Sequence, residues 1–85
     1  MPKLNAELLE WRVVGDEVVA LDLRSSVYLA VSAVGAHVWP LLAEGAEVDA
    51  LVDAVVERFD VDAADARRDL DAFIASLDER GLLLP

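Results

Sequence analysis

The chain has 85 residues, no cysteine and a formal charge of −10, with 17 Asp/Glu against seven Lys/Arg. Its length suits one domain over residues 1–85, and the lack of cysteine excludes a disulfide framework, a thiolate metal site and a thiol nucleophile. No apolar run approaches the roughly 18 residues that cross a bilayer and residues 1–10 hold no secretory signal, so we expect a cytoplasmic protein without a membrane span.

The first third of the chain alternates apolar and polar residues as β-strands do. Residues 11–14 and 17–23 flank Gly15-Asp16, a two-residue hairpin signal. The second of these strands is expected to have one well-buried face. Its alternate positions form two sets, Val19, Leu21 and Leu23 on one side and Val18, Ala20 and Asp22 on the other.

A third strand is predicted over residues 26–31, after a turn at Arg24-Ser25. It carries no charge, and both of its faces are largely apolar: Val27, Leu29 and Val31 on one, Tyr28 and Ala30 on the other. A three-stranded meander leaves its first and third strands at the edges, and edges are normally protected by charge, proline or bulges. The third strand is therefore expected to accept another strand.

From Ser32 onward the apolar period is helical, and three helices are expected. The first begins with Ser32 as N-cap and ends near Gly45, and Pro40 within it should bend or loosen it. The second carries an apolar stripe of Val48, Leu51, Val52, Val55, Val56 and Phe59. The third runs from the N-cap Asp62 to Gly81 at C′, with apolar positions Ala66, Leu70, Phe73, Ile74 and Leu77.

Three strands followed by three helices indicate α+β architecture, in which a three-stranded antiparallel sheet is packed on one side by helices. The connections between the helices are short, which suits a helix-turn-helix arrangement. The sheet then takes the place of a wing, so we expect a winged helix-turn-helix.

The chain resembles a known family through the order and spacing of short patterns that cover most of its length. These are Val18 to Leu23, Ser26-Val27-Tyr28-Leu29, Ser32-Ala33-Val34-Gly35-Ala36-His37-Val38-Trp39, Leu41-Leu42 with Glu44-Gly45, Phe59-Asp60-Val61-Asp62, Leu70 to Leu77, and Arg80-Gly81-Leu82-Leu83. They resemble peptide-recognition elements related to the pyrroloquinoline quinone biosynthesis protein D, which also form the N-terminal part of lasso-peptide B proteins. Pro40 and His37 depart from the family pattern.

The resemblance implies a protein that binds the leader of a ribosomally made precursor peptide, without a cofactor or metal. In that family the leader pairs with the third strand, and its side chains enter a groove walled by the third helix. The implied partners are a separate leader peptidase and a lasso cyclase. Carried onto this chain, the leader-binding residues are Val27, Tyr28, Leu29, Ala30, Val31, Asp69, Leu70, Phe73 and Leu77, and Asp69 can also receive a leader Lys or Arg.

Several of these positions also have a purely structural interpretation. Phe73 lies at the margin of its apolar stripe, which makes it a better groove candidate than its neighbours. Tyr28 can instead cover the outer face of the sheet. Packing in the core is the alternative for Val27, Leu29, Leu70, Ile74 and Leu77.

Other kinds of site receive little support from the sequence. His37 is the only histidine, and without cysteine or a second imidazole it cannot anchor zinc. The acidic positions Asp60, Asp62, Asp65 and Asp69 lack the glycine and glutamate of a calcium loop, so helix capping and solvation explain them better. No catalytic nucleophile and base stand in a recognisable motif, so we expect a protein that is not an enzyme.

Two other functions share this architecture. A winged-helix DNA-binding protein should carry Lys and Arg along its second or third helix, whereas the second helix here has one arginine against Glu47, Asp49, Asp53 and Glu57. A scaffold or dimerisation module is the second alternative, because an uncharged edge strand can pair with its own copy. We therefore expect a monomer or weak dimer that binds neither nucleic acid nor membrane.

Overall fold

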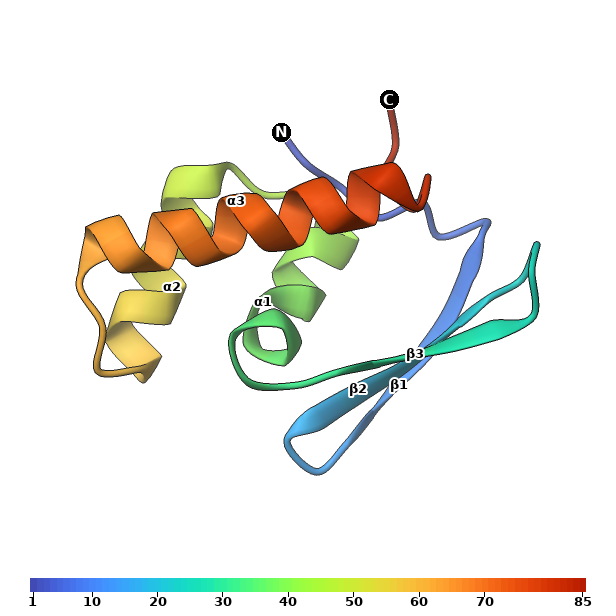
Figure 1. The fold of residues 1–85 in the computed structure, drawn as a ribbon, viewed down its shortest axis with the longest axis horizontal. Helices are drawn as coiled ribbons and strands as arrows, with labels where there is room; N and C mark the ends of the chain where they lie inside the picture. The colour runs from blue at the N-terminus through green and yellow to red at the C-terminus, as the bar shows by residue number, and fades with distance from the viewer.

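The computed structural model describes all 85 residues as a three-stranded antiparallel sheet followed by three helices (Figure 1). The strand order is β1-β2-β3. This arrangement confirms the α+β fold of the winged helix-turn-helix type that the sequence predicts. The elements are β1 (Leu9–Val14), β2 (Glu17–Asp22), β3 (Val27–Val31), α1 (Ala33–Glu44), α2 (Val48–Arg58) and α3 (Ala63–Glu79).

The first turn of the sheet follows from a local sequence signal. Val14 pairs with Glu17, so Gly15 and Asp16 form the predicted two-residue turn, and the φ of Gly15 is 62°. Two-residue hairpin loops need a positive φ at their first position, which glycine adopts without a Cβ clash. The β2–β3 turn is longer and contains a second positive φ, 59°, at Ser26.

The buried face of β2 is the one formed by Val18 and Ala20. Their side chains are 1% and 0% exposed, whereas Leu23 is 45% exposed and Val19 and Leu21 are only partly covered. The strand thus has one buried face as expected, but the more apolar of its two faces is the uncovered one. The helices pack on the other side, where the small side chain of Ala20 lets α1 approach the sheet.

A single core joins the sheet, the three helices and both ends of the chain. Trp39 and Leu42 of α1 are fully buried at its centre, and the rings of Trp39 and Trp11 pack edge to face with 6.2 Å between their centroids. Such edge-to-face pairs add to the stabilisation from burial. Val56 was expected on the buried stripe of α2, but its side chain is exposed.

The two predicted N-caps differ in the structure. The Asp62 carboxylate accepts a hydrogen bond from the Asp65 amide at 2.8 Å, which caps α3 as expected. Ser32 occupies the cap position of α1, but its side chain makes no capping hydrogen bond. At the other end of α3, Gly81 has a φ of 71° and the Leu82 amide donates to the Leu77 carbonyl, which completes a Schellman motif.

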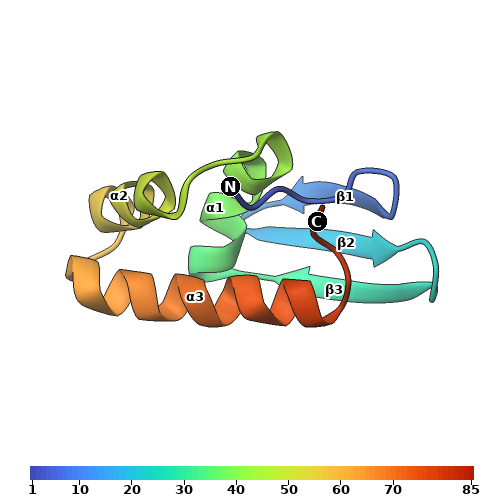
Figure 2. The same cartoon turned by 90° about the horizontal axis from the view of Figure 1, so that it is seen from above.

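The C-terminal tail docks on the N-terminal segment of the chain. The Asn5 amide donates to the Leu82 carbonyl at 2.9 Å, and the Leu84 amide donates to the Lys3 carbonyl at 2.8 Å. Figure 2 shows the tail turning from the end of α3 across the sheet toward the N-terminus, away from the free side of β3. The tail therefore leaves the edge of β3 uncovered. None of the helices has the length and apolar character needed to cross a membrane.

Candidate functional site

The free side of β3 is an edge of the sheet. β3 pairs with β2 on one side and with no other strand of the chain on the other. Along an antiparallel strand, alternate residues direct their N–H and C=O groups to opposite sides, so an edge strand presents one row of unpaired groups. No residue from Val27 to Val31 is charged or fully buried. The strand can therefore form a second ladder of hydrogen bonds with an extended segment.

An open groove of about 490 Å³ lies between β3 and α3. One wall is the strand, from Tyr28 to Ser32, and the floor is the first turn of α1 with Val34 and Gly35. The other wall consists of residues at helical spacing, namely Asp69, Phe73, Ser76 and Leu77 of α3 and Arg80, which caps the C-terminal end of α3. The unpaired strand edge and the groove are thus parts of one continuous surface.

Seven of the nine predicted site residues line this groove, namely Tyr28, Leu29, Ala30, Val31, Asp69, Phe73 and Leu77. Val27 lies at the start of the strand, outside the groove, and Leu70 is fully buried in the core. Phe73 is half-buried, in agreement with its place at the margin of the apolar stripe. The role of all nine in peptide binding stays a prediction.

The structure adds lining residues that the sequence reasoning did not select, among them Gly35, Ser76 and Arg80. Ser76 and Arg80 stand seven and eleven positions after Asp69, so helical spacing from that residue would have found them. No local signal marks Gly35, because its importance comes from what packs against it.

Gly35 allows the floor of the groove to form. A Cβ at this position would lie 2.7 Å from Cγ1 of Val31 and 3.0 Å from Cε1 of Phe73, which is closer than side chains normally approach. The first turn of α1 therefore contacts both walls at once. Any larger residue at position 35 would push the Phe73 ring or the Val31 side chain from its place.

A hydrogen bond joins the turn that precedes β3 to the end of α3. The Arg24 guanidinium donates to the Arg80 carbonyl at 2.8 Å, and Nε of Arg24 lies 3.4 Å from the Asp22 carboxylate. The backbone amide of Arg24 also donates to that carboxylate, and this bond holds the pKa of Asp22 below its usual value, against the opposing effect of desolvation. These contacts fix the distance between the two walls at one end of the groove.

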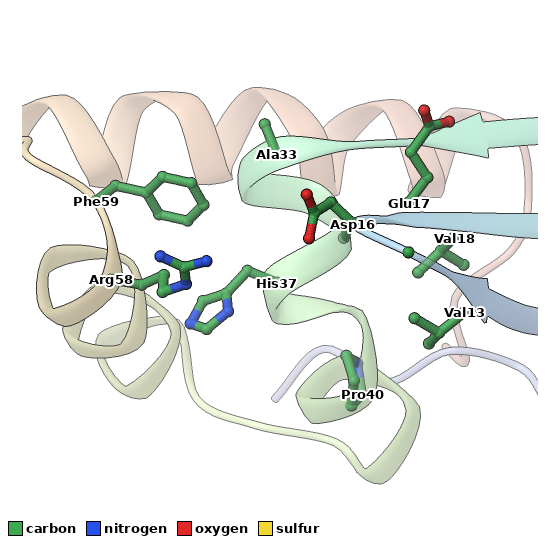
Figure 3. Close-up of a pocket in the computed structure, with 11 residues that line it drawn as sticks. Val13, Asp16, Glu17, Val18, Ala33, His37, Pro40, Arg58 and Phe59 are labelled. Carbon is green, nitrogen blue, oxygen red and sulfur yellow. The ribbon is translucent and has the colours of Figure 1, made fainter.

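A second cavity, of about 420 Å³, lies beside the β1–β2 turn, on the face where α1 meets the end of α2 (Figure 3). Asp16 and Glu17 of the hairpin border it on one side, and Arg58 and Phe59 on the other. His37 projects between them and its ring packs edge-on against Phe59, 5.7 Å between centroids. No group of three or more His, Cys, Asp or Glu side chains comes together as a metal site anywhere in the structure.

Comparison with known proteins extends these observations. The family model described as "Coenzyme PQQ synthesis protein D (PqqD)" matches residues 17–83. The solved structure "TbiB1 in Complex with the TbiA(beta) Leader Peptide" is similar with a TM-score of 0.86 and 34% identity, over 95% of this chain and 93% of that chain. "Lasso peptide synthetase B1 complexed with the leader peptide" has a TM-score of 0.84 and 26% identity, over 99% of this chain and 98% of that chain. No curated protein matches significantly.

Proposed function

The chain belongs to the PqqD family, and we propose that it binds the leader segment of a ribosomally synthesised precursor peptide, of the lasso-peptide class, by strand addition to β3. The observation that carries this proposal is the unpaired, uncharged edge of β3, which opens directly on the groove walled by α3. Two similar structures, described as complexes with a leader peptide, support it.

The proposed binding combines two kinds of contact. Backbone hydrogen bonds from β3 to the leader supply affinity that does not depend on sequence, and alternate leader side chains enter the groove and supply selectivity. The apolar part of the groove centres on Leu29, Val31 and Phe73. Burial of each leader side chain contributes roughly 1.5–3 kcal/mol. The entropy lost when the peptide becomes ordered offsets part of this gain. Two or three buried side chains contribute roughly 3–9 kcal/mol before this cost, so the backbone hydrogen bonds must supply part of the about 8 kcal/mol that micromolar binding requires.

We propose that the chain acts as a single recognition domain that is not itself an enzyme. It holds the leader for a separate leader peptidase and a lasso cyclase, which carry out the chemistry. The likeness of the whole chain to proteins whose structures contain a bound leader supports this division of labour. A leader fixed at β3 has its remaining, unbound part free to enter the active site of another protein.

The test is a titration of the isotope-labelled chain with the leader that is encoded beside its own gene, followed by amide NMR. Amide signals of Val27 to Val31 should shift at micromolar peptide, because these groups acquire new hydrogen-bond partners. Signals of Gly15 and Asp16, in a turn outside the groove, should stay in place. A peptide of the same composition in scrambled order is the control.

Unchanged spectra at high leader concentration would contradict the proposal. The uncharged edge also allows pairing with a second copy of the chain, which is the alternative scaffold function. Light scattering separates the two: leader binding predicts a monomer that takes up one peptide. A dimer whose mass does not change when leader is added would favour the scaffold.

A further inference from the structure

The direction of α3 relative to β3 is fixed by contacts at both ends of the groove. At one end, Arg24 in the turn before β3 donates to the Arg80 carbonyl after α3. At the other end, Gly35 lies against both Val31 and Phe73. The strand and the helix therefore run in opposite directions, as Figure 2 also shows. Asp69 precedes Phe73 by one helical turn, so it stands beside the C-terminal end of β3 and Arg80 beside its N-terminal end.

Asp69 and Arg80 are the only charged residues that line the groove. Neither side chain takes part in an ion pair or a hydrogen bond. The other arginines of α3 are engaged, Arg67 with Asp49 and Arg68 with Asp65. The groove thus has a free negative charge at one end and a free positive charge at the other.

The separation of these charges matches the geometry of an added strand. Arg80, the C-cap of α3, follows Asp69 by 11 positions, about 16 Å along the helix axis at about 1.5 Å per residue. A strand that rises about 3.4 Å per residue covers this distance in about five residues. Only alternate residues of a strand face the helix, so positions i and i+4 fit best. Four residues of strand are slightly shorter than the distance between Asp69 and Arg80, and the long side chains of Lys, Arg and Glu can span this difference.

We propose that the groove selects its peptide by a register of charge. A strand added antiparallel to β3 places Lys or Arg opposite Asp69 and, four residues toward its own C-terminus, Asp or Glu opposite Arg80. This inference rests on the proposed function, and it specifies which charged residues the bound peptide carries and how they are spaced. A slip of one residue would turn both charges to the outer face of the sheet, so the two pairs fix the position of the leader as well as its direction.

The test uses two synthetic peptides of nine residues that share one composition. Both carry apolar residues at their other inward positions, including the single inward position between the two charges. The first has Lys followed four residues later by Glu, and the second has these two residues exchanged. An exposed ion pair changes Kd by up to about fivefold, so the first peptide should bind about tenfold more tightly by fluorescence anisotropy. The difference should shrink in 0.5 M NaCl, because salt screens exposed charges.

A charge-exchanged variant supplies the decisive comparison. Asp69→Lys with Arg80→Glu should reverse the preference, so that the second peptide binds more tightly. The matched control is Asp71→Lys with Arg68→Glu, which makes the same charge changes on α3 at exposed positions outside the groove. This control should keep the preference of the original chain. Thermal unfolding checks that both variants fold.

The outcomes distinguish this inference from the function on which it rests. Equal affinity of the two peptides, with amide shifts along β3, would overturn the charge register and leave leader binding in place. A preference that survives the exchange at positions 69 and 80 would also overturn it. If neither the peptides nor the natural leader perturb β3, the proposed function fails and the register fails with it.

Discussion

Phe73 is the residue in which the core and the groove meet. Its ring is half-buried and lies 6.5 Å from the ring of Trp39, which belongs to the core. Its outer part lines the groove opposite Val31. Leu70, three residues earlier, is fully buried and does not reach the groove. The two side chains therefore allow binding and stability to be separated by mutation.

Phe73→Ala should weaken leader binding by at least about tenfold, or about 1.4 kcal/mol, because the leader loses the apolar surface it packs against. Its cost in stability should be below the roughly 2–5 kcal/mol expected for Leu70→Ala, which opens a cavity in the core. Calorimetric titration and urea unfolding measure the two effects. If Phe73→Ala is as destabilising as Leu70→Ala, and its folded fraction binds normally, Phe73 belongs to the core alone.

At the scale of elements, the helix ends differ in what determines them: local sequence for some, tertiary packing for others. α3 begins with a side-chain cap from Asp62 and ends with a Schellman motif at Gly81. α1 begins directly after β3 without a side-chain cap, and its first residue, Ala33, has a φ of 51°. Packing against the sheet therefore fixes the start of α1, whereas sequence signals fix both ends of α3.

This difference predicts unequal effects of removing the two caps. Asp62→Ala should lower the free energy of unfolding by about 1 kcal/mol, because the Asp65 amide loses its partner. Ser32→Ala should lower it by no more than a few tenths of a kcal/mol, since the hydroxyl caps nothing. Urea unfolding of both variants provides the measurement. If both substitutions lower the free energy of unfolding by similar amounts, the Ser32 hydroxyl does form a capping hydrogen bond at the start of α1 in solution.

At the scale of the whole molecule, the acidic charge is barely compensated. Only three ion pairs form, and each involves an exposed arginine. Exposed pairs contribute little to stability. A net charge of −10 on 85 residues therefore leaves a repulsion between carboxylates that opposes the compact state.

We expect NaCl to raise the melting temperature, because 0.5 M salt screens this repulsion. A gain of about 1 kcal/mol corresponds to about 4–8 °C in a domain of this size. In the variant Asp53→Lys with Glu57→Lys, the net charge falls from −10 to −6, since each substitution adds two units. Its response to salt should be smaller. A melting temperature that falls with NaCl in the original chain would contradict this account.

The sequence by itself determined the parts of the fold that depend on neighbouring residues. The Gly15-Asp16 turn, the bounds of the helices within one or two residues, the Asp62 cap and the Gly81 terminus all follow from local signals. The absence of charge on β3 was equally visible in the sequence. Of the candidate groove, the sequence pattern indicated the strand, whereas the α3 positions Asp69, Phe73 and Leu77 came from the resemblance to the family.

Only the tertiary structure decided which surfaces meet. Alternation along β2 groups Val18 with Ala20 but does not tell which face the helices cover, because both faces are apolar. The sequence likewise does not show the close approach at Gly35, or the hydrogen bond from Arg24 to the Arg80 carbonyl, which joins residues 56 positions apart. The C-terminal tail pairs with the N-terminal segment and leaves β3 open. Contacts between segments distant in sequence settle these points, and no local pattern encodes them.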